Sequence, residues 1–200
     1  MSVMCIRGGT PLEGELTVHG AKNSILPILA ACLLAREPVT LYNCPKLTDV
    51  SAALNILRHL GCQVSQEGHT VVVDPAGAKG SSISEEQMRT MRSSIIFLGP
   101  LLARTGEAHL TYPGGCELGP RPIDLHLSAI RAMGCEVTEE RGIHCMGRPS
   151  GGDVQLALPS VGATENAMLC AVGGTGTTTI TNAAREPEIS DLQSFLNSLG

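Results

Sequence analysis

The feature that most constrains the fold is an internal repeat with a period of about seventy residues. Residues 33–36 recur with the same four letters as residues 101–104, and each copy precedes a β-rich stretch. A second element, in which a helical pattern leads through Gly-Cys into a strand, occurs at residues 57–64 and 130–137. A third copy of this element runs up to Gly200. The chain is therefore predicted to fold as similar supersecondary units placed side by side.

Each unit is predicted to contain a helix, a strand, a second helix and two further strands. The first helix of unit one is expected from about Lys22 to Ala35, and its apolar residues cover most of its surface, which indicates a buried helix. The second, near Thr48 to Leu60, is amphipathic and is followed by Gly61, a typical stop. Unit three lacks its closing strands. The fold class is predicted as α/β, with mixed sheets on a threefold repeat.

Local signals place two further helices. Residues 84–87 read Ser-Glu-Glu-Gln, a capping box, and they are expected to start a helix that holds Arg89 and Arg92. Residues 159–164 are expected to open a third buried helix, whose amides could bind a diphosphate or could form an ordinary cap. Residues 173–177 resemble a nucleotide-binding loop but lack its strand-loop-helix context, so a turn is predicted.

Composition excludes several classes of protein. Hydrophobic residues make up 42% of the 200 residues and charged residues 16%, which predicts a folded chain. The net charge of -5 argues against nucleic acid as a partner, and an anionic ligand would need a local basic cluster. The longest apolar run, residues 25–35, is too short for a membrane span. The eight Cys of the chain form no CxxC pair, so no metal site is expected. A cytoplasmic protein is predicted, in which most of these thiols are buried and reduced.

The loop at residues 113–126 is the most informative segment for chemistry. Three Gly and three Pro surround Cys116 and Arg121, so the segment cannot be regular and is expected to join a strand to a helix. A thiol beside Arg121, near a helix start at Ile123, would have a lowered pKa. A plain turn with an incidental Cys explains the same residues equally well, and loop physics alone leaves both interpretations open.

Cationic residues give a second signal. Lys22 stands at the start of a buried helix beside Asn23, where free N–H groups suit a phosphate or a carboxylate, although a solvated Lys is the alternative. Arg89 and Arg92 are three residues apart and are expected on one helical face, which could equally be a solvated charged face. The corresponding helix starts of the three units hold Lys22-Asn23, Arg92-Ser93 and Thr164-Glu165. The repeat predicts that these starts meet at one rim.

Four separated segments resemble the UDP-N-acetylglucosamine 1-carboxyvinyltransferase family. They are residues 20–23 (Gly-Ala-Lys-Asn), 90–94, the Cys116 loop and 182–188. The resemblance covers essentially the whole chain. It implies an inside-out α/β barrel, in which each of two domains contains three βαβαββ units.

The resemblance also implies a domain division. Residues 1–19 would be strands of the other, mostly missing domain. Residues 20–200 would form one enolpyruvyl transferase domain. Its repeats would span about 20–75, 76–148 and 149–200, with the third incomplete.

Site residues follow from the same resemblance. Cys116 is implied to be the general acid and the thiol that forms a covalent adduct, which fosfomycin alkylates in the family. Lys22, Asn23 and Arg121 are implied to bind phosphoenolpyruvate. The implied contacts to UDP-N-acetylglucosamine are Arg92, Arg121, Pro122, Ile123, Asp124, Leu125, Ser160 and Val161. Some members have a Lys where this chain has Leu158, so this chain departs from them beside the implied diphosphate contact.

The implied activity is enolpyruvyl transfer from phosphoenolpyruvate to the 3-hydroxyl of UDP-N-acetylglucosamine, with release of phosphate. This reaction begins peptidoglycan precursor synthesis, and therefore serves cell-wall growth, cell shape and cell division. The implied partners are the two small-molecule substrates, with no metal or organic cofactor, no nucleic acid and no membrane.

Two alternatives remain at this stage. One is the shikimate-pathway enolpyruvyl transferase, which shares the fold but lacks the Pro-Gly-Gly-Cys loop. The other is a non-catalytic fragment that binds a UDP-sugar. The family's aspartate base and a further Arg would lie beyond Gly200, so the chain alone is expected to be inactive until a C-terminal half completes the active site.

Overall fold

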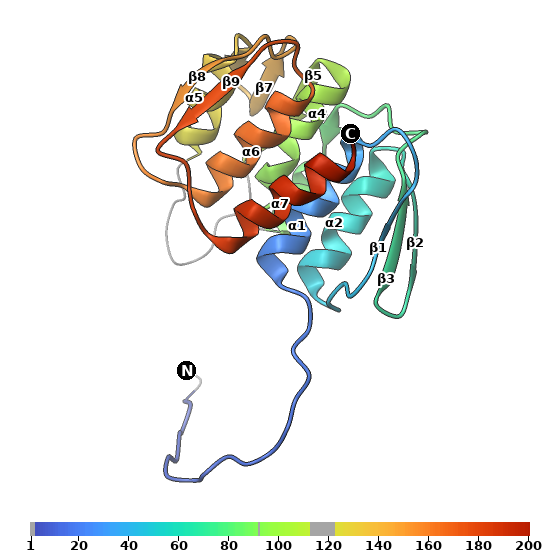
Figure 1. The fold of residues 1–200 in the computed structure, drawn as a ribbon, viewed down its shortest axis with the longest axis vertical. Helices are drawn as coiled ribbons and strands as arrows, with labels where there is room; N and C mark the ends of the chain where they lie inside the picture. Colours follow the sequence, from blue (N-terminus) through green and yellow to red (C-terminus); the bar gives the residue numbers. More distant parts are fainter. Residues whose placement is uncertain (1–2, 92, 113–122) are drawn as a thin grey trace.

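The structure is a computed structural model, and it describes residues 3–91, 93–112 and 123–200 (Figure 1). The helical elements are α1 (Lys22–Ala31), η1 (Cys32–Leu34), α2 (Thr48–His59), α3 (Glu85–Thr90), η2 (Ser94–Phe97), α4 (Leu98–Thr105), α5 (Asp124–Ala132), α6 (Val161–Val172) and α7 (Pro187–Ser198), where η marks 3-10 helices. The strands are β1 (Val39–Leu41), β2 (Gln63–Glu67), β3 (Thr70–Asp74), β4 (Ser82–Ile83), β5 (Glu107–Leu110), β6 (Glu136–Thr138), β7 (Ile143–Met146), β8 (Gly152–Gln155) and β9 (Thr178–Thr181).

The described strands form three separate sheets, each built from one continuous part of the chain. The sheet orders are β1-β3-β2, β4-β5-β7-β6 and β8-β9. Pairing is antiparallel except for β4 with β5 and β8 with β9, which are parallel. Mixed pairing of this kind agrees with an α/β fold. The assignment of the sheets to barrel repeats stays a prediction.

The helices pack together and supply most of the core. Helix α1 contacts α2 and α7, while α6 contacts α4, α5 and α7. Figure 1 shows α1, α2, α6 and α7 alongside one another, with β1, β2 and β3 at one side and β8 and β9 at another. Leu29, Leu57, Leu102 and Leu169 are fully buried in this core. Because the helices pack directly against one another, the position of each helix start relative to the others is fixed.

Most expected helix boundaries are confirmed. Helix α1 begins at Lys22 and continues through the 3-10 turn η1, and α2 covers the expected amphipathic segment. The Ser84 capping box is present, with the backbone N–H of Gln87 donating to the hydroxyl of Ser84. Ser160 caps α6 in the same way by accepting from the backbone of Ala163.

One expected helix is shorter than the sequence indicated. Helix α3 ends at Thr90, because Met91 has an extended backbone with φ of −140° and ψ of 124°. The prediction that Arg89 and Arg92 share a helical face is therefore wrong. Arg89 instead forms an ion pair with Glu85, one turn earlier, at 2.5 Å. Arg92 lies outside the described residues.

The first segment of the chain has no regular structure. Residues 3–20 contain neither helix nor strand, and Figure 1 shows them running away from the packed helices. Large apolar side chains in this segment, including Ile6, Leu12 and Leu16, are more than four-fifths exposed. The assignment of residues 1–19 to another domain stays a prediction.

The cysteines behave largely as small apolar residues. Six of them are buried, namely Cys32, Cys44, Cys62, Cys135, Cys145 and Cys170, which confirms the expectation for most of the eight. Cys5 is exposed, and Cys116 lies outside the described residues. In the part of the chain that the structure describes, no helix has the length and apolar character needed to cross a membrane.

Candidate functional site

Several helix starts meet around one cavity of about 450 Å³. The cavity is lined by Lys22, Asn23, Leu26, Pro27, Asp49, Ser93, Ile96, Val161, Gly162, Glu165 and Glu188. These residues come from the first two turns of α1 and α6, from the first turns of α2 and α7, and from η2 and the residue before it. The expectation that the corresponding helix starts of the three units meet at one rim is confirmed for the described residues.

This arrangement favours an anionic ligand. The first N–H groups of a helix have no partner within the helix, and the helix dipole adds a partial positive charge at that end. Helix α1 follows Ala21, which has no side chain able to cap it. The first turn of α1 therefore offers N–H groups next to the ammonium group of Lys22, as phosphate and carboxylate groups require.

Carboxylates of the protein itself bind the polar side chains in the first turn of α1. The Nζ of Lys22 pairs with Asp49 of α2, and the Lys22 side chain is about half exposed. From α7, Glu188 accepts a hydrogen bond from Asn23 at 3.3 Å, and Asp191 accepts one from Ser24 at 2.5 Å. An anionic ligand at this site would have to compete with Asp49 and Glu188.

Glu165 is the most perturbed acid in the cavity. It lies on α6 and is only 7% exposed. Burial, and after it the negative charge of Glu188, raises the pKa of Glu165 to about 8. At neutral pH this side chain is therefore mostly an uncharged carboxylic acid, which removes one negative charge from the cavity.

A buried hydrogen-bond network fixes the neighbouring elements. The side chain of Asn166 accepts from the backbone N–H of Gly99 at 2.8 Å and donates to the carbonyl of Ile95 at 2.9 Å. Its amide also lies 2.8 Å from Nδ1 of His126. Because Asn166 uses its oxygen on Gly99, its nitrogen donates to His126, and the remaining proton of the ring lies on Nε2.

His126 faces the start of α6. A Cβ atom added to Gly162 would lie 3.1 Å from Cε1 of His126, so the ring and the helix backbone are in close contact. Burial lowers the pKa of His126 to about 4, opposed by the charge of Asp124. The imidazole is therefore neutral at physiological pH and is held in one orientation at the edge of the cavity.

The segment before α7 is tied to α6 as well. The backbone N–H of Ala184 donates to the hydroxyl of Thr164 at 3.0 Å, and that hydroxyl donates to the carbonyl of Ser160 at 2.8 Å. Thr164 is buried, so this link is protected from water. It positions residues 182–188, one of the four segments that carry the family resemblance, against the first turn of α6.

The predicted site residues are only partly brought together. Lys22, Asn23 and Val161 line the cavity, and Ser160 caps α6 at its edge. Ile123, Asp124 and Leu125 lie at the start of α5 and are not among the described residues that line it. The remaining predicted site residues lie outside the described part of the chain; they are Arg92, Cys116, Arg121 and Pro122. The roles of all these residues stay predictions.

Three residues of this region, Asp49, His126 and Glu188, were not predicted from the sequence. Glu165 was expected at the rim, but its burial and its raised pKa were not predicted. A usable signal for them existed, because Glu165 is the only charged residue in the otherwise uncharged helix α6. Asp49 and Glu188 gave no such signal, since an acid in the first turn of a helix is common. Their contacts with α1 depend on tertiary packing.

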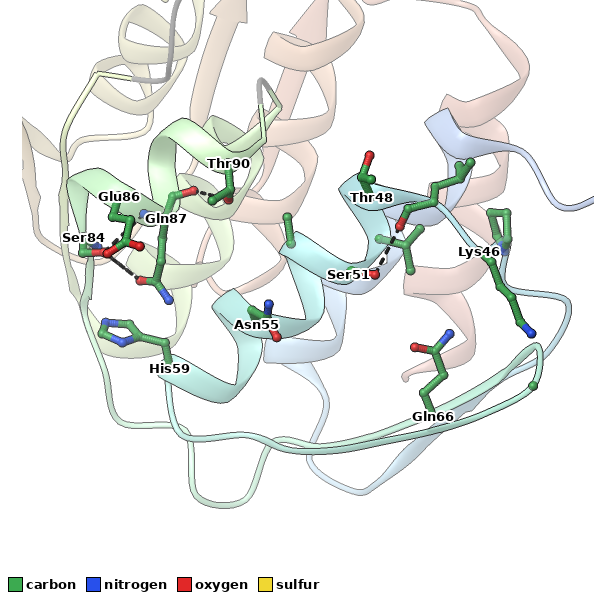
Figure 2. A pocket seen from close by; sticks show the side chains of 15 residues that line it. Lys46, Thr48, Ser51, Asn55, His59, Gln66, Ser84, Glu86, Gln87 and Thr90 are labelled. Carbon is green, nitrogen blue, oxygen red and sulfur yellow. Dashed lines mark hydrogen bonds between the residues drawn. The ribbon is translucent and has the colours of Figure 1, made fainter.

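A larger groove of about 1140 Å³ lies elsewhere (Figure 2). Figure 2 shows Thr48, Ser51, Asn55 and His59 of α2 along it, with α3 at one end and Gln66 of β2 opposite. Its lining is mainly uncharged and polar, with Lys46 and Glu86 as its described charged residues, and it contains none of the predicted site residues. The smaller cavity is therefore the better candidate for an anionic substrate.

Known proteins resemble the chain along its length. The family model described as EPSP synthase (3-phosphoshikimate 1-carboxyvinyltransferase) matches residues 6–200. A UDP-N-acetylglucosamine 1-carboxyvinyltransferase 2 of Caldanaerobacter subterraneus subsp. tengcongensis is 54% identical over 98% of this chain and 47% of its own length. A UDP-N-acetylglucosamine 1-carboxyvinyltransferase 1 of Carboxydothermus hydrogenoformans is 50% identical over 100% of this chain and 48% of its own length.

Solved structures agree on the fold. The enolpyruvyl transferase NikO from Streptomyces tendae matches with a TM-score of 0.83 at 23% identity, over 96% of this chain and 46% of that chain. An EPSP synthase from Acinetobacter baumannii matches with a TM-score of 0.67 at 18% identity, over 88% and 42%. This chain spans about half the length of the curated relatives it matches.

Proposed function

Since the chain belongs to the EPSP synthase family, we propose that it forms part of an enzyme that transfers the enolpyruvyl group from phosphoenolpyruvate to the 3-hydroxyl of UDP-N-acetylglucosamine. The observation that carries this proposal is the 54% identity with a UDP-N-acetylglucosamine 1-carboxyvinyltransferase across nearly the whole chain. Relatives with that name remain 43% identical or more over the same length. The match to EPSP synthase structures is far weaker, at 18–19% identity.

The proposed reaction proceeds by addition and elimination. The 3-hydroxyl of the sugar gives up its proton to a base as its oxygen bonds to the central carbon of phosphoenolpyruvate, while a general acid delivers a proton to the methylene carbon. The tetrahedral intermediate then loses a proton from the new methyl group and expels phosphate, which restores the double bond. The phosphate and carboxylate oxygens carry negative charge throughout both steps, and fixed positive groups stabilise that charge.

Lys22 and Asn23 are proposed to bind phosphoenolpyruvate at the start of α1. Support comes from the cavity itself, where the uncapped first turn of α1 stands beside the Lys22 ammonium group. In this account the substrate takes over Lys22 from Asp49 and Asn23 from Glu188. The proton held by Glu165 helps, because a third ionised carboxylate would repel the substrate.

The remaining roles are carried over from the family resemblance. Cys116 is proposed to protonate the methylene carbon and to be the thiol that fosfomycin alkylates, and Arg121 to meet phosphate. Arg92 and the segment from Arg121 through Pro122, Ile123 and Asp124 to Leu125 are proposed to contact the nucleotide sugar. Ser160 and Val161 are proposed to meet its diphosphate, since the start of α6 provides backbone N–H groups beside the cavity.

The whole protein is proposed to have two inside-out barrel domains, with the active site between them and no cofactor. Residues 20–200 would form three repeats of one domain, and residues 1–19 would pair with the other. A cytoplasmic place at the start of peptidoglycan synthesis is part of the same proposal. The chain corresponds to about half of each curated relative, so further residues are proposed to complete the catalytic groups.

The acceptor can be tested by phosphate release from the complete enzyme. We expect release from phosphoenolpyruvate with UDP-N-acetylglucosamine and not with shikimate 3-phosphate. A Cys116→Ala variant should lower the rate by about 10² to 10⁴, as for loss of a positioned general acid. Turnover with shikimate 3-phosphate would favour the alternative acceptor, and tight UDP-sugar binding without turnover would indicate a binding module.

A further inference from the structure

The outward face of the four-stranded sheet carries an unusual row of polar side chains. Cross-strand pairing places Ser82 of β4 opposite His109 of β5, and His109 opposite His144 of β7. The neighbouring residues Ala108 and Cys145 point to the other face and are fully buried. Glu107 is two residues before His109 on β5 and therefore shares its outward face.

The side chains of Glu107, His109 and His144 bring their polar atoms close together. Nε2 of His109 lies 2.6 Å from Oε1 of Glu107, and Nε2 of His144 lies 3.4 Å from the same oxygen. The two imidazole rings are stacked, with centroids 3.9 Å apart and planes 18° apart. The ligand atoms of all three residues lie within 4.8 Å of one another.

The hydrogen bonds of the protein leave this cluster incomplete. His109 has Glu107 as its partner, but Nε2 of His144 is shielded from solvent and has no hydrogen-bond partner among the described residues. A shielded polar atom without a partner costs free energy, and native structures contain few such atoms. A ligand bound by both imidazole nitrogens and by the carboxylate would give every polar atom of the cluster a partner.

We propose that Glu107, His109 and His144 form a binding site for a divalent first-row transition metal ion such as Zn²⁺. Imidazole nitrogen and carboxylate oxygen are ligands that such ions prefer, whereas Mg²⁺ and Ca²⁺ prefer oxygen alone. Three protein ligands with one open position suit a tetrahedral ion that also holds a water. The side chains are 34% to 44% exposed, so the cluster lies at the surface, and a rotation of the His144 ring exposes its shielded Nε2 to an ion from solvent.

The distances between the ligand atoms need only a small adjustment, but the two stacked rings must also rotate, because an ion has to lie in the plane of each imidazole that binds it. Zinc lies about 2.0–2.2 Å from such ligands, so neighbouring ligand atoms around a tetrahedral ion are roughly 3.4 Å apart. The separation of His144 and Glu107 already has this value, while Glu107 must move away from His109 by less than about 1 Å. The proton on any coordinating Nε2 moves to Nδ1 or to water. The β5–β7 register keeps the two histidines opposite each other.

This site is separate from the cavity at the helix starts. No residue that lines that cavity belongs to β5 or β7. The spacing of the cluster in the sequence gave no metal motif, because two ligands lie on one strand and the third lies 35 positions after His109. A bound ion would join β5 to β7 and stabilise the folded state, since it binds the folded chain preferentially.

The test is a calorimetric titration of the metal-free, reduced 200-residue chain with Zn²⁺, repeated with Ni²⁺. We expect one ion per chain in a saturable step, and an increase in the Tm of the chain with Zn²⁺ but not with Mg²⁺. His109→Ala, His144→Ala and Glu107→Gln should each weaken binding at least about tenfold, because even indirect support of a metal ligand is worth that much. His59→Gln, which changes an exposed histidine on α2, is the matched control and should bind normally.

Thiols are the competing ligands, and the absorption spectrum of the Co²⁺-loaded chain distinguishes them. Thiolate ligation produces an intense near-ultraviolet charge-transfer band, which imidazole and carboxylate do not. Circular dichroism of each variant checks that the sheet is intact. The proposal is overturned by a thiolate band, by unchanged binding in the His109→Ala, His144→Ala double variant, or by the absence of a saturable step.

Discussion

Lys22 illustrates how one residue can be both paired and available. Its ammonium group is held by Asp49, yet its side chain remains about half exposed at the mouth of the cavity. Exposed ion pairs contribute roughly 0–1 kcal/mol to stability, so a substrate anion can displace Asp49 at little cost. The pairing keeps Lys22 near the start of α1 without locking it there.

Substitution of Lys22 should therefore affect turnover and leave stability almost unchanged. In the complete enzyme we expect Lys22→Ala to lower kcat/KM at least about tenfold, because a charge-assisted hydrogen bond contributes about 1.5–3 kcal/mol. Lys22→Arg should also fail, since a planar guanidinium does not replace a compact ammonium group. Lys46→Ala, in the larger groove, is the control. Near-normal kinetics for both Lys22 variants would return Lys22 to the role of a solvated surface residue.

Glu165 predicts an unusual dependence of stability on pH. Its pKa is about 8 in the folded chain against an ordinary value of 4.5, so the folded state retains a proton that the unfolded state releases. The stabilising contribution is complete below about pH 4.5 and is lost as the pH rises towards 8.

The matching variant is Glu165→Gln, which keeps the shape and removes the titration. Between pH 5 and pH 8 its free energy of unfolding should fall by less than that of the unchanged chain, by on the order of a few kcal/mol. Urea unfolding at several pH values measures this difference. Parallel pH profiles for the two proteins would show that Glu165 is ionised in the folded state.

At the scale of elements, one side chain of α6 connects three neighbours. Asn166 binds the backbone of Gly99 in α4 and of Ile95 in η2, and it donates to His126 in α5. All of these contacts are buried, so they hold the helix starts around the cavity in one arrangement.

Asn166→Ala should consequently be costly. It leaves a backbone N–H, a backbone carbonyl and a histidine nitrogen buried without partners, and each unsatisfied group costs about 1–3 kcal/mol. We expect a loss of several kcal/mol in the free energy of unfolding, measured with urea. Asn55→Ala on α2, whose side chain is exposed, should lose less than about 1 kcal/mol. Equal effects of the two substitutions would contradict the account of the network.

Elements were predictable where the signal is local. The Ser84 capping box and the Ser160 cap specify helix starts within a few residues, and the apolar pattern of residues 22–35 shows that its helix is buried. The pairing of Glu188 with Asn23, separated by 165 positions, depends on how α7 packs on α1 and has no local signature. The early end of α3 at Thr90 was missed because Arg89 and Arg92 fit a helical spacing that the backbone does not follow.

At the scale of the whole molecule, the repeat in the sequence predicted a shared rim. Lys22, Ser93 and Glu165, which the sequence repeat places at corresponding positions, line one cavity. The position of the Cys116 loop relative to this cavity could not be derived from the repeat, because its Gly and Pro residues interrupt the periodic pattern on which the repeat argument rests. That loop lies outside the described residues.

We predict that the 200-residue chain alone releases no phosphate from the two substrates above background. The chain is about half as long as its curated relatives, and a closed cleft between two domains is proposed to exclude water and assemble the catalytic groups. The complete enzyme, assayed in parallel, is the positive control. Robust turnover by the 200 residues, lost in Cys116→Ala, would show that the second half is dispensable.

The most direct test of the central claim is the mass of the product formed by the complete enzyme from UDP-N-acetylglucosamine and phosphoenolpyruvate. The account predicts a nucleotide sugar that has gained one enolpyruvyl group, formed in equal amount with phosphate, and at least about tenfold more slowly by Lys22→Ala. Phosphate released without a new nucleotide sugar, or an unchanged rate for Lys22→Ala, would contradict it.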